Sequence, residues 1–279
     1  MVPKVAGSSP VDRPSLRQDS VTFIQALLLG ILQGITEFFP VSSSAHLKIA
    51  KFFFNLDTGE SLVLFDLVSH LGSLLALVWF LRKQIYELLI RDLHLWILFA
   101  IAIIPLFFFY VFMKPIRIFF SDIHYTPFFL LLSALFLFIT SYKKEKDFMK
   151  RESKIKDVLF IGSMQALALI PGISRSGSTI SAACIRGWQL KEAVLFSFLL
   201  AIPTVVGGTV LEGYKNIALL KSANGLNIMH YLIGFISAFS IGLLSIRYLF
   251  SLTERRKLKP FAWYCLILSL VLITYFNII

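Results

Sequence analysis

The stretch Gln33–His46, QGITEFFPVSSSAH, lies inside an apolar segment but carries a carboxylate, three consecutive serines, a histidine and a proline. A second stretch, Gln165–Thr179, reads QALALIPGISRSGST and repeats the order of glutamine, proline and serine, with one residue fewer before its proline. Each proline should end a helix, because the residue before a proline disfavours helical backbone. We therefore predict one unit repeated twice, with two broken helices that meet at a shared site.

The composition predicts an all-α polytopic membrane protein. Of the 279 residues, 57% are hydrophobic and only 15% are charged, which is unusual for a soluble domain. The apolar residues fall into blocks of roughly 17–25, enough to cross a bilayer as a helix. About six spanning helices are expected, at Leu62–Leu81, Leu93–Met113, Thr126–Tyr142, Ala193–Leu211, Tyr231–Phe250 and Phe261–Phe276. Two interrupted blocks, about Val21–Phe54 and Asp157–Arg186, should form re-entrant helical hairpins, which membranes accept only where protein or a watery cavity covers the break.

The chain is expected to consist of a polar tail and a single membrane domain. Residues 1–20 contain three prolines and no apolar core, which predicts a disordered tail, or a start site placed too far upstream, and not a signal peptide. The membrane domain covers 21–279, with repeat one at about 21–142, repeat two at about 157–279 and a charged linker at 143–156.

The net charge of +11 comes from Lys and Arg in the loops between the apolar blocks, which is the pattern of a membrane protein and not of a nucleic-acid-binding protein. The linkers Arg82–Asp92, Lys143–Lys156, Arg186–Lys191 and Arg247–Lys259 contain 3, 7, 2 and 5 of them, and Lys114–Tyr125 and Gly213–His230 contain 2 each. The positive-inside rule puts the first set in the cytoplasm. The two hairpins then enter from opposite faces, as in an inverted-topology repeat whose site lies near mid-membrane.

In the first hairpin, Gln33 and Glu37 are four residues apart and share one helical face. Glu37 is a functional candidate, because an ionisable side chain at membrane depth is costly unless it has a role. Ser42 or Ser43 can cap the half-helix that follows. His46 comes three residues after Ser43 and should lie on the same face of its first turn.

In the second hairpin, Ser174 is the expected N-cap of a half-helix from Arg175 to Arg186. Arg175, Ser178 and Thr179 share a face of that helix. A buried arginine needs an anion, and its fork of donors suits a phosphate better than a carboxylate. The alternative is a salt bridge from Arg175 to Glu37 without substrate.

Four other residues are expected to be structural. Asp66 and His70 are four residues apart in the first spanning block and should pair with each other. Cys184 and Cys265 lie in apolar blocks without a disulfide or zinc spacing, so free, buried thiols are expected.

Two half-helix N-termini directed at one place would provide free N–H groups and positive dipole ends, which bind anions. Together with Arg175, this predicts a phosphate or diphosphate site. The residues expected to bind the substrate are Gln33, Ser42, Ser44, Ser174, Ser176 and Thr179. Glu37 fits such a site if a divalent cation bridges it to the phosphates. Ser43 and His46 supply a nucleophile and an acid–base group for breaking a P–O bond.

Two other phosphate chemistries do not match. The chain has no Walker loop, which argues against nucleotide-driven chemistry. One family of acid phosphatases uses Ser-Arg followed six residues later by His, but Ser181 stands at that place after Arg175.

The motifs Glu37-Phe-x-Pro-Val-Ser-Ser-x-x-His46 and Pro171-Gly-x-Ser-Arg-Ser-Gly-x-Thr179 resemble the two signature motifs of the undecaprenyl-diphosphate phosphatase, or bacitracin-resistance, family of bacterial inner membranes. The resemblance covers nearly everything after residue 20. It implies a multi-pass inner-membrane enzyme that removes the terminal phosphate of the polyprenyl diphosphate carrier and so recycles it for peptidoglycan synthesis. It also implies an active site toward the periplasm and a divalent cation, Mg or Ca.

Carried over by position, the resemblance implies that Glu37, Ser43, His46 and Arg175 are catalytic and that Glu37 also binds the metal. Either Ser43 or His46 could be the nucleophile. Gln33 stands where many members have glutamate, so a two-carboxylate metal site is in doubt here. Ser44-Ala45 replaces a frequent Thr-Gly, and His70 replaces a frequent glutamine; neither should abolish activity.

Two other functions are compatible with the same sequence features. A transporter or flippase of a phosphorylated polyprenyl lipid would use the same inverted repeats and broken helices. A structural assembly factor would tolerate loss of Glu37, His46 and Arg175. The sequence is silent on oligomeric state, and a homodimer is left open.

Overall fold

The computed structural model describes residues 21–56, 60–91, 93–142, 154–215, 227–254 and 258–278. These ranges are helical and contain no β-strand. The expected tail at 1–20 and the linker residues 143–153 lie outside the described residues. The two cysteines are free and buried, as predicted.

The helices are named in the order in which they occur along the chain. In chain order they are α1 (Phe23–Thr36), α2 (Ser43–Phe53), α3 (Glu60–Phe80), α4 (Arg82–Arg91), α5 (Leu93–Phe112), α6 (Lys114–Phe119), the 3-10 turn η1 (Ile123–Tyr125), α7 (Thr126–Tyr142), α8 (Lys154–Leu167), α9 (Arg175–Ile185), α10 (Leu190–Lys215), α12 (Ile228–Glu254) and α13 (Lys259–Ile278).

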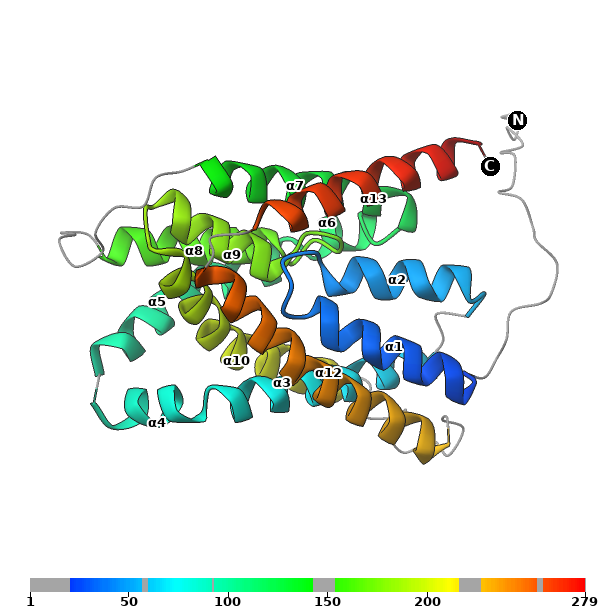
Figure 1. Ribbon diagram of the computed structural model, residues 1–279, viewed down its shortest axis with the longest axis horizontal. Coiled ribbons are helices and arrows are strands. Elements are labelled where there is room, and N and C mark those ends of the chain that lie inside the picture. Colours follow the sequence, from blue (N-terminus) through cyan, green and yellow to red (C-terminus); the bar gives the residue numbers. More distant parts are fainter. Residues whose placement is uncertain are drawn as a thin grey trace, which may run out of the picture.

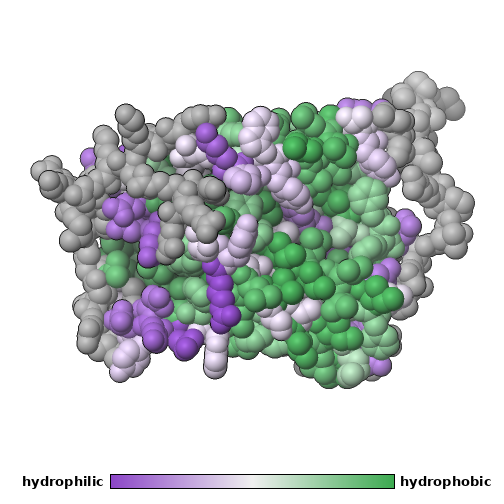
Figure 2. Space-filling model, in the orientation of Figure 1, coloured by the Kyte–Doolittle hydropathy of each residue, from purple (hydrophilic) through white to green (hydrophobic). Residues whose placement is uncertain are grey.

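Six of these helices are long and apolar enough to cross a membrane, which confirms the predicted class of fold. The segments are Leu62–Phe80, Leu95–Phe112, Ile123–Ser141, Leu190–Lys215, Ile228–Thr253 and Lys259–Asn277. Figure 2 shows that hydrophobic residues cover much of the described surface on this face, while hydrophilic residues gather toward the end where α4 lies. Large apolar side chains such as Ile104, Phe107 and Ile267 are exposed, as expected for helices solvated by lipid.

The two interrupted blocks form helical hairpins, α1–α2 and α8–α9. They approach from opposite ends of the molecule, and their tips meet near its middle (Figure 1). The first helix starts with a capping box between Thr22 and Gln25. It ends before Pro40, as predicted, because a proline disfavours helix at the preceding residue.

Each hairpin packs against a helix of the other predicted repeat, through a glycine that lies three residues before the glutamine of its motif, Gly30 before Gln33 and Gly162 before Gln165. A Cβ on Gly30 of α1 would lie 2.7 Å from the carbonyl oxygen of Gly234 on α12. A Cβ on Gly162 of α8 would lie 2.2 Å from the carbonyl oxygen of Ala102 on α5. Both positions therefore require glycine for close helix approach. The contacts α1–α12 and α8–α5 correspond to each other under the predicted repeat.

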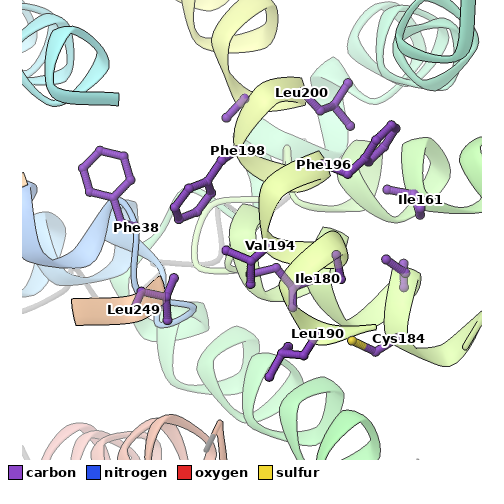
Figure 3. Close-up of a cluster of buried hydrophobic side chains, with 14 of the residues drawn as sticks. Phe38, Ile161, Ile180, Cys184, Leu190, Val194, Phe196, Phe198, Leu200 and Leu249 are labelled. Atoms are coloured by element: carbon purple, nitrogen blue, oxygen red, sulfur yellow. The ribbon is translucent and has the colours of Figure 1, made fainter. Parts of the chain in front are cut away.

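An apolar cluster holds the first hairpin's tip against the second repeat. Figure 3 shows the Phe198 side chain of α10 directed toward Phe38, in a cluster that also contains side chains from α8, α9 and α12. The Phe38 and Phe198 rings make an edge contact, with centroids 5.6 Å apart. Phe38 is 2% exposed. Because Phe38 follows Glu37 in the chain, this packing fixes the position of the carboxylate.

Candidate functional site at the hairpin tips

The two tips place the N-termini of α2 and α9 close to each other. Ser42 caps α2 by accepting a hydrogen bond from the backbone N–H of Ala45, at 3.3 Å. Ser174 caps α9 in the same way, from Gly177 at 3.0 Å. Ser42 has a φ of 73°, a conformation that costs energy for a residue with a Cβ. Both capping predictions are confirmed, with Ser42 as the cap of the first half-helix.

Three polar contacts join the tips across the molecule. Arg175 Nη2 lies 2.5 Å from Glu37 Oε1. The Ser176 hydroxyl donates to the carbonyl oxygen of Phe39 at 3.2 Å, and the backbone N–H of Gly172 donates to the Ser44 hydroxyl at 3.4 Å. The two broken helices therefore meet, as predicted from their matching motifs.

The carboxylate of Glu37 is buried and surrounded by donors. Its Oε2 accepts hydrogen bonds from Gln33 Nε2 at 3.0 Å and from Ser43 Oγ at 2.8 Å. His70 Nε2 lies 3.8 Å from the same oxygen. Gln33 also donates to the Ser73 hydroxyl at 3.3 Å. Charge-assisted hydrogen bonds of this kind stabilise an ionised carboxylate.

A cavity of about 500 Å³ opens beside Glu37 and Arg175. Its polar lining includes Ser42, Ser43, Ser44, Ser174 and Ser176, and its apolar lining includes Val63, Leu67, Leu106, Leu169, Ile173 and Val205. The cavity thus has room for a charged group and an adjoining apolar segment. Gln33, His46 and Thr179 are not among the residues that line it.

The structure does not bring His46 to Ser43. Its Nδ1 lies 2.7 Å from the carbonyl oxygen of Ser42, and its Nε2 shares a hydrogen bond of 2.8 Å with the hydroxyl of Tyr264 on α13. The two rings are stacked, with centroids 5.6 Å apart. The imidazole therefore packs on α13, although its place in the sequence is one turn from Ser43.

Thr179 also turns away from the cavity. Its hydroxyl donates to the carbonyl oxygen of Arg175 at 3.0 Å and shares a hydrogen bond of 2.6 Å with Ser197 on α10. It is 1% exposed. Thr179 therefore ties the first turn of α9 to α10.

The predicted pair between Asp66 and His70 was wrong. Asp66 Oδ2 lies 2.5 Å from Nζ of Lys51, a residue in the last turn of α2. The His70 ring instead uses Nδ1 against the backbone carbonyl oxygen of Asp66, at 2.7 Å, and presents Nε2 to Glu37. His70 and Ser73 thus belong to the surroundings of Glu37, a role that sequence reasoning missed. Their signal was polar side chains spaced three residues apart inside an apolar helix.

Two buried acceptor oxygens at or beside the site have no hydrogen-bond partner in the described part of the chain. The described residues contain no group of three or more His, Cys, Asp or Glu side chains placed to hold a metal. However, Gln33 Oε1 and Asp66 Oδ1 are buried acceptors without a hydrogen-bond partner. The Gln33 amide is hydrogen-bonded to the Glu37 carboxylate, and Asp66 lines the cavity. Amide and carboxylate oxygens are the ligands that Mg²⁺ and Ca²⁺ prefer.

The fold and the site define a class: polytopic membrane proteins with an anion-accepting site between two helical hairpins. The chain belongs, within this class, to the family described as bacitracin resistance protein BacA, whose profile matches residues 26–271.

Relatives with curated names extend over nearly the whole chain. The undecaprenyl-diphosphatase of Protochlamydia amoebophila is 39% identical over 92% of this chain and 100% of its own length. The protein of the same name from Methanobrevibacter smithii is 36% identical over 89% of this chain and 95% of its own. That of Acinetobacter baumannii is 34% identical over 90% and 94%.

Proposed function

We propose that this protein is an integral membrane phosphatase that hydrolyses undecaprenyl diphosphate to undecaprenyl phosphate and inorganic phosphate. The relatives named undecaprenyl-diphosphatase support this activity. The observation that carries it is that Arg175, Glu37 and Ser43 meet in one cavity whose wall also includes apolar side chains. A lipid diphosphate presents this combination of an anionic group and a hydrocarbon chain.

In the cell, the reaction regenerates the monophosphate lipid carrier for peptidoglycan synthesis, and it confers the bacitracin resistance after which the family is named. The protein lies in the bacterial inner membrane with its active site toward the periplasm. The excess of Lys and Arg in the linkers 82–92, 143–156 and 247–259 supports this orientation, because such linkers stay in the cytoplasm.

Substrate binding starts with an exchange of partners at Arg175. In the structure its guanidinium pairs with Glu37, and a diphosphate offers it a stronger bidentate acceptor. The hydroxyls of Ser44 and Ser174 and the first N–H groups of α2 and α9 complete an anion-binding shell. The Ser176 hydroxyl joins this shell once it releases the carbonyl oxygen of Phe39. This exchange frees one oxygen of Glu37.

Ser43 is the nucleophile that this geometry favours. Its hydroxyl already donates to Glu37 Oε2 at 2.8 Å, so the carboxylate can take the proton as the oxygen attacks the terminal phosphorus. A Ser43–phosphorus bond forms, the bond to the bridging oxygen breaks, and its electron pair leaves on the lipid phosphate.

Water then attacks the phosphoserine. Glu37 returns the proton that it took from Ser43 to the departing Ser43 oxygen, which restores both the serine and the carboxylate, and the attacking water leaves with both of its protons as part of the released phosphate. His46 supports this turn through the carbonyl oxygen of Ser42. To act on the phosphate directly, the His46 ring would first have to break its hydrogen bond with the Tyr264 hydroxyl.

A divalent cation, Mg or Ca, completes the proposed site. Glu37 would hold it, with the free Gln33 Oε1 as a second ligand. When bound, such a cation neutralises charge that develops on the phosphate oxygens.

One assay separates the enzyme from the alternative of a lipid carrier. Purified protein in detergent is given undecaprenyl diphosphate, and released phosphate is measured with and without a chelator. The phosphatase turns over without any second compartment, whereas a pure transporter releases nothing. Absence of phosphate release at all cation concentrations would refute the proposed activity.

A further inference from the structure

Gln165, on α8, is a buried amide that no described residue satisfies. Its side chain is 2% exposed. Neither Nε2 nor Oε1 has a hydrogen-bond partner, and the residue lines the same cavity as Arg175 and Ser174. Because an unpaired buried amide destabilises a protein, a side chain of this kind in a cavity indicates a ligand that satisfies it.

The equivalent residue in the first hairpin shows why Gln165 is unpaired. Gln33 uses its amide nitrogen on Glu37, four residues later, and on Ser73 of α3. The position four residues after Gln165 is Leu169, which offers no acceptor. The second repeat thus keeps the amide without its internal partner, and both polar atoms are left for the cavity.

We infer that Gln165 binds the diphosphate head group of the substrate, with Nε2 donating a hydrogen bond to a phosphate oxygen. Arg175 and the cap residues Ser42 and Ser174, at the N-termini of α2 and α9, line the same cavity, so an anion is the ligand that suits a further N–H donor there. The Oε1 atom is then free to accept from a water in the site. This role rests on the proposed phosphatase function and adds a specific binding residue to it.

The test compares Gln165→Leu and Gln165→Glu with the wild-type protein, using undecaprenyl diphosphate as substrate and methylene diphosphonate as a non-hydrolysable competitor. Gln165→Leu should lower kcat/KM at least tenfold, mainly through KM, and should weaken competition by the diphosphonate by a similar factor. Its melting temperature should stay the same or rise, because an unsatisfied amide is gone. Gln165→Glu should be worse still, since a carboxylate repels phosphate.

Ser181→Ala is the matched control. Ser181 is also fully buried with an unpaired hydroxyl, but it does not line the cavity. Its replacement should leave kcat/KM and diphosphonate binding unchanged. Gln165→Met replaces Gln165→Leu if the latter does not fold.

The outcomes separate this inference from the proposed function. If wild-type protein releases phosphate and Gln165→Leu keeps more than half of its kcat/KM and diphosphonate affinity, the inference is wrong and the phosphatase stands. If the wild type releases no phosphate, the phosphatase is wrong. Stabilisation of the wild type, but not of Gln165→Leu, by methylene diphosphonate in thermal melts would then still support Gln165 as an anion ligand, and equal stabilisation would overturn it.

Discussion

Arg175 Nη2 lies 2.5 Å from Glu37 Oε1, and the two residues are 138 positions apart in the chain. The Glu37 side chain is 8% exposed and that of Arg175 is 23% exposed. The ion pair joins the tips of two hairpins that come from opposite ends of the molecule. It also holds the carboxylate and the guanidinium where a phosphate must enter. One contact therefore serves both assembly of the tips and binding of the substrate.

Removing either partner should have unequal effects on stability. Arg175→Ala leaves a buried carboxylate without its counterion, which should cost up to roughly 3 kcal/mol of unfolding free energy. Glu37→Gln removes a charge and leaves the more exposed Arg175, so it should cost less. Thermal melts in detergent test this order. Equal or reversed melting temperatures would show that the ion pair is not what holds the tips.

Arg175→Ala and Arg175→Lys should differ in activity. Lysine keeps the positive charge but lacks the planar fork, so its kcat/KM should fall by about ten- to a hundredfold. Arg175→Ala should fall by about a hundred- to a thousandfold, the usual loss when one donor to a transition-state anion is removed. Arg175→Ala with more than a tenth of wild-type kcat/KM would contradict the role of Arg175.

A covalent intermediate should form on Ser43. If substrate labelled in its terminal phosphate is mixed with enzyme and quenched in acid, the label should stay on the protein as acid-stable phosphoserine. Ser43→Ala should lose the label and at least about a hundredfold in kcat, because no other hydroxyl donates to Glu37 among the described residues. An acid-labile label that persists in Ser43→Ala would assign the attack to His46.

The contacts of His46 predict that replacing His46 and replacing its partner Tyr264 have different effects on turnover. His46→Ala should lower turnover more than tenfold, because the ring supports the carbonyl oxygen of Ser42 at the turn before Ser43. Tyr264→Phe keeps that contact and should retain at least half of the activity, at a cost of about 1 kcal/mol in stability. Turnover and melting temperature are measured on both variants. His46→Ala with more than a tenth of wild-type turnover would contradict this supporting role of His46.

Sequence reasoning was strong where signals are local. The prolines, the serine caps and the lengths of the apolar blocks predicted both hairpins and the six long helices, because each depends on residues within one or two turns. The matching order of residues in the two motifs predicted that the tips meet. Each broken helix exposes polar groups inside the membrane, and the other hairpin can cover them.

It was weak where a side chain chooses among distant partners. His46 turns to Tyr264, which is 218 residues away in the chain. Asp66 pairs with Lys51 on a neighbouring helix instead of with His70 on its own. Helical spacing shows which residues share a face, but not which other helix packs on that face.

Two glycines should respond oppositely to the same substitution. Gly30→Ala would place a Cβ 2.0 Å from the Ser237 hydroxyl and against the backbone of α12, so it should cost about 1–3 kcal/mol by overpacking. Gly207→Ala adds a methyl group where no atom lies within 4 Å and should stabilise α10 by about 0.5–1 kcal/mol. Melting temperatures of the two variants report the difference. A tolerated alanine at position 30 would contradict the close packing of α1 on α12.

The cation requirement of the enzyme should depend on the amide of Gln33, which donates to Glu37. Chelation should abolish phosphate release, and Mg or Ca should restore it, because the acceptor oxygens at the site are those of a hard-cation site. Gln33→Glu adds a second carboxylate next to Glu37, which lies within 3.0 Å of the present amide. A cation site with two negative charges binds more tightly, so half-maximal activity should need several-fold less cation in this variant. Glu37→Gln should show the reverse, with little rescue at any cation concentration. The matched control is Gln25→Glu, since Gln25 lies at the start of the same helix and its side chain accepts a hydrogen bond from the backbone N–H of Thr22, away from Glu37. If Gln33→Glu shifts the cation requirement no more than Gln25→Glu does, the metal is not held at Gln33 and Glu37.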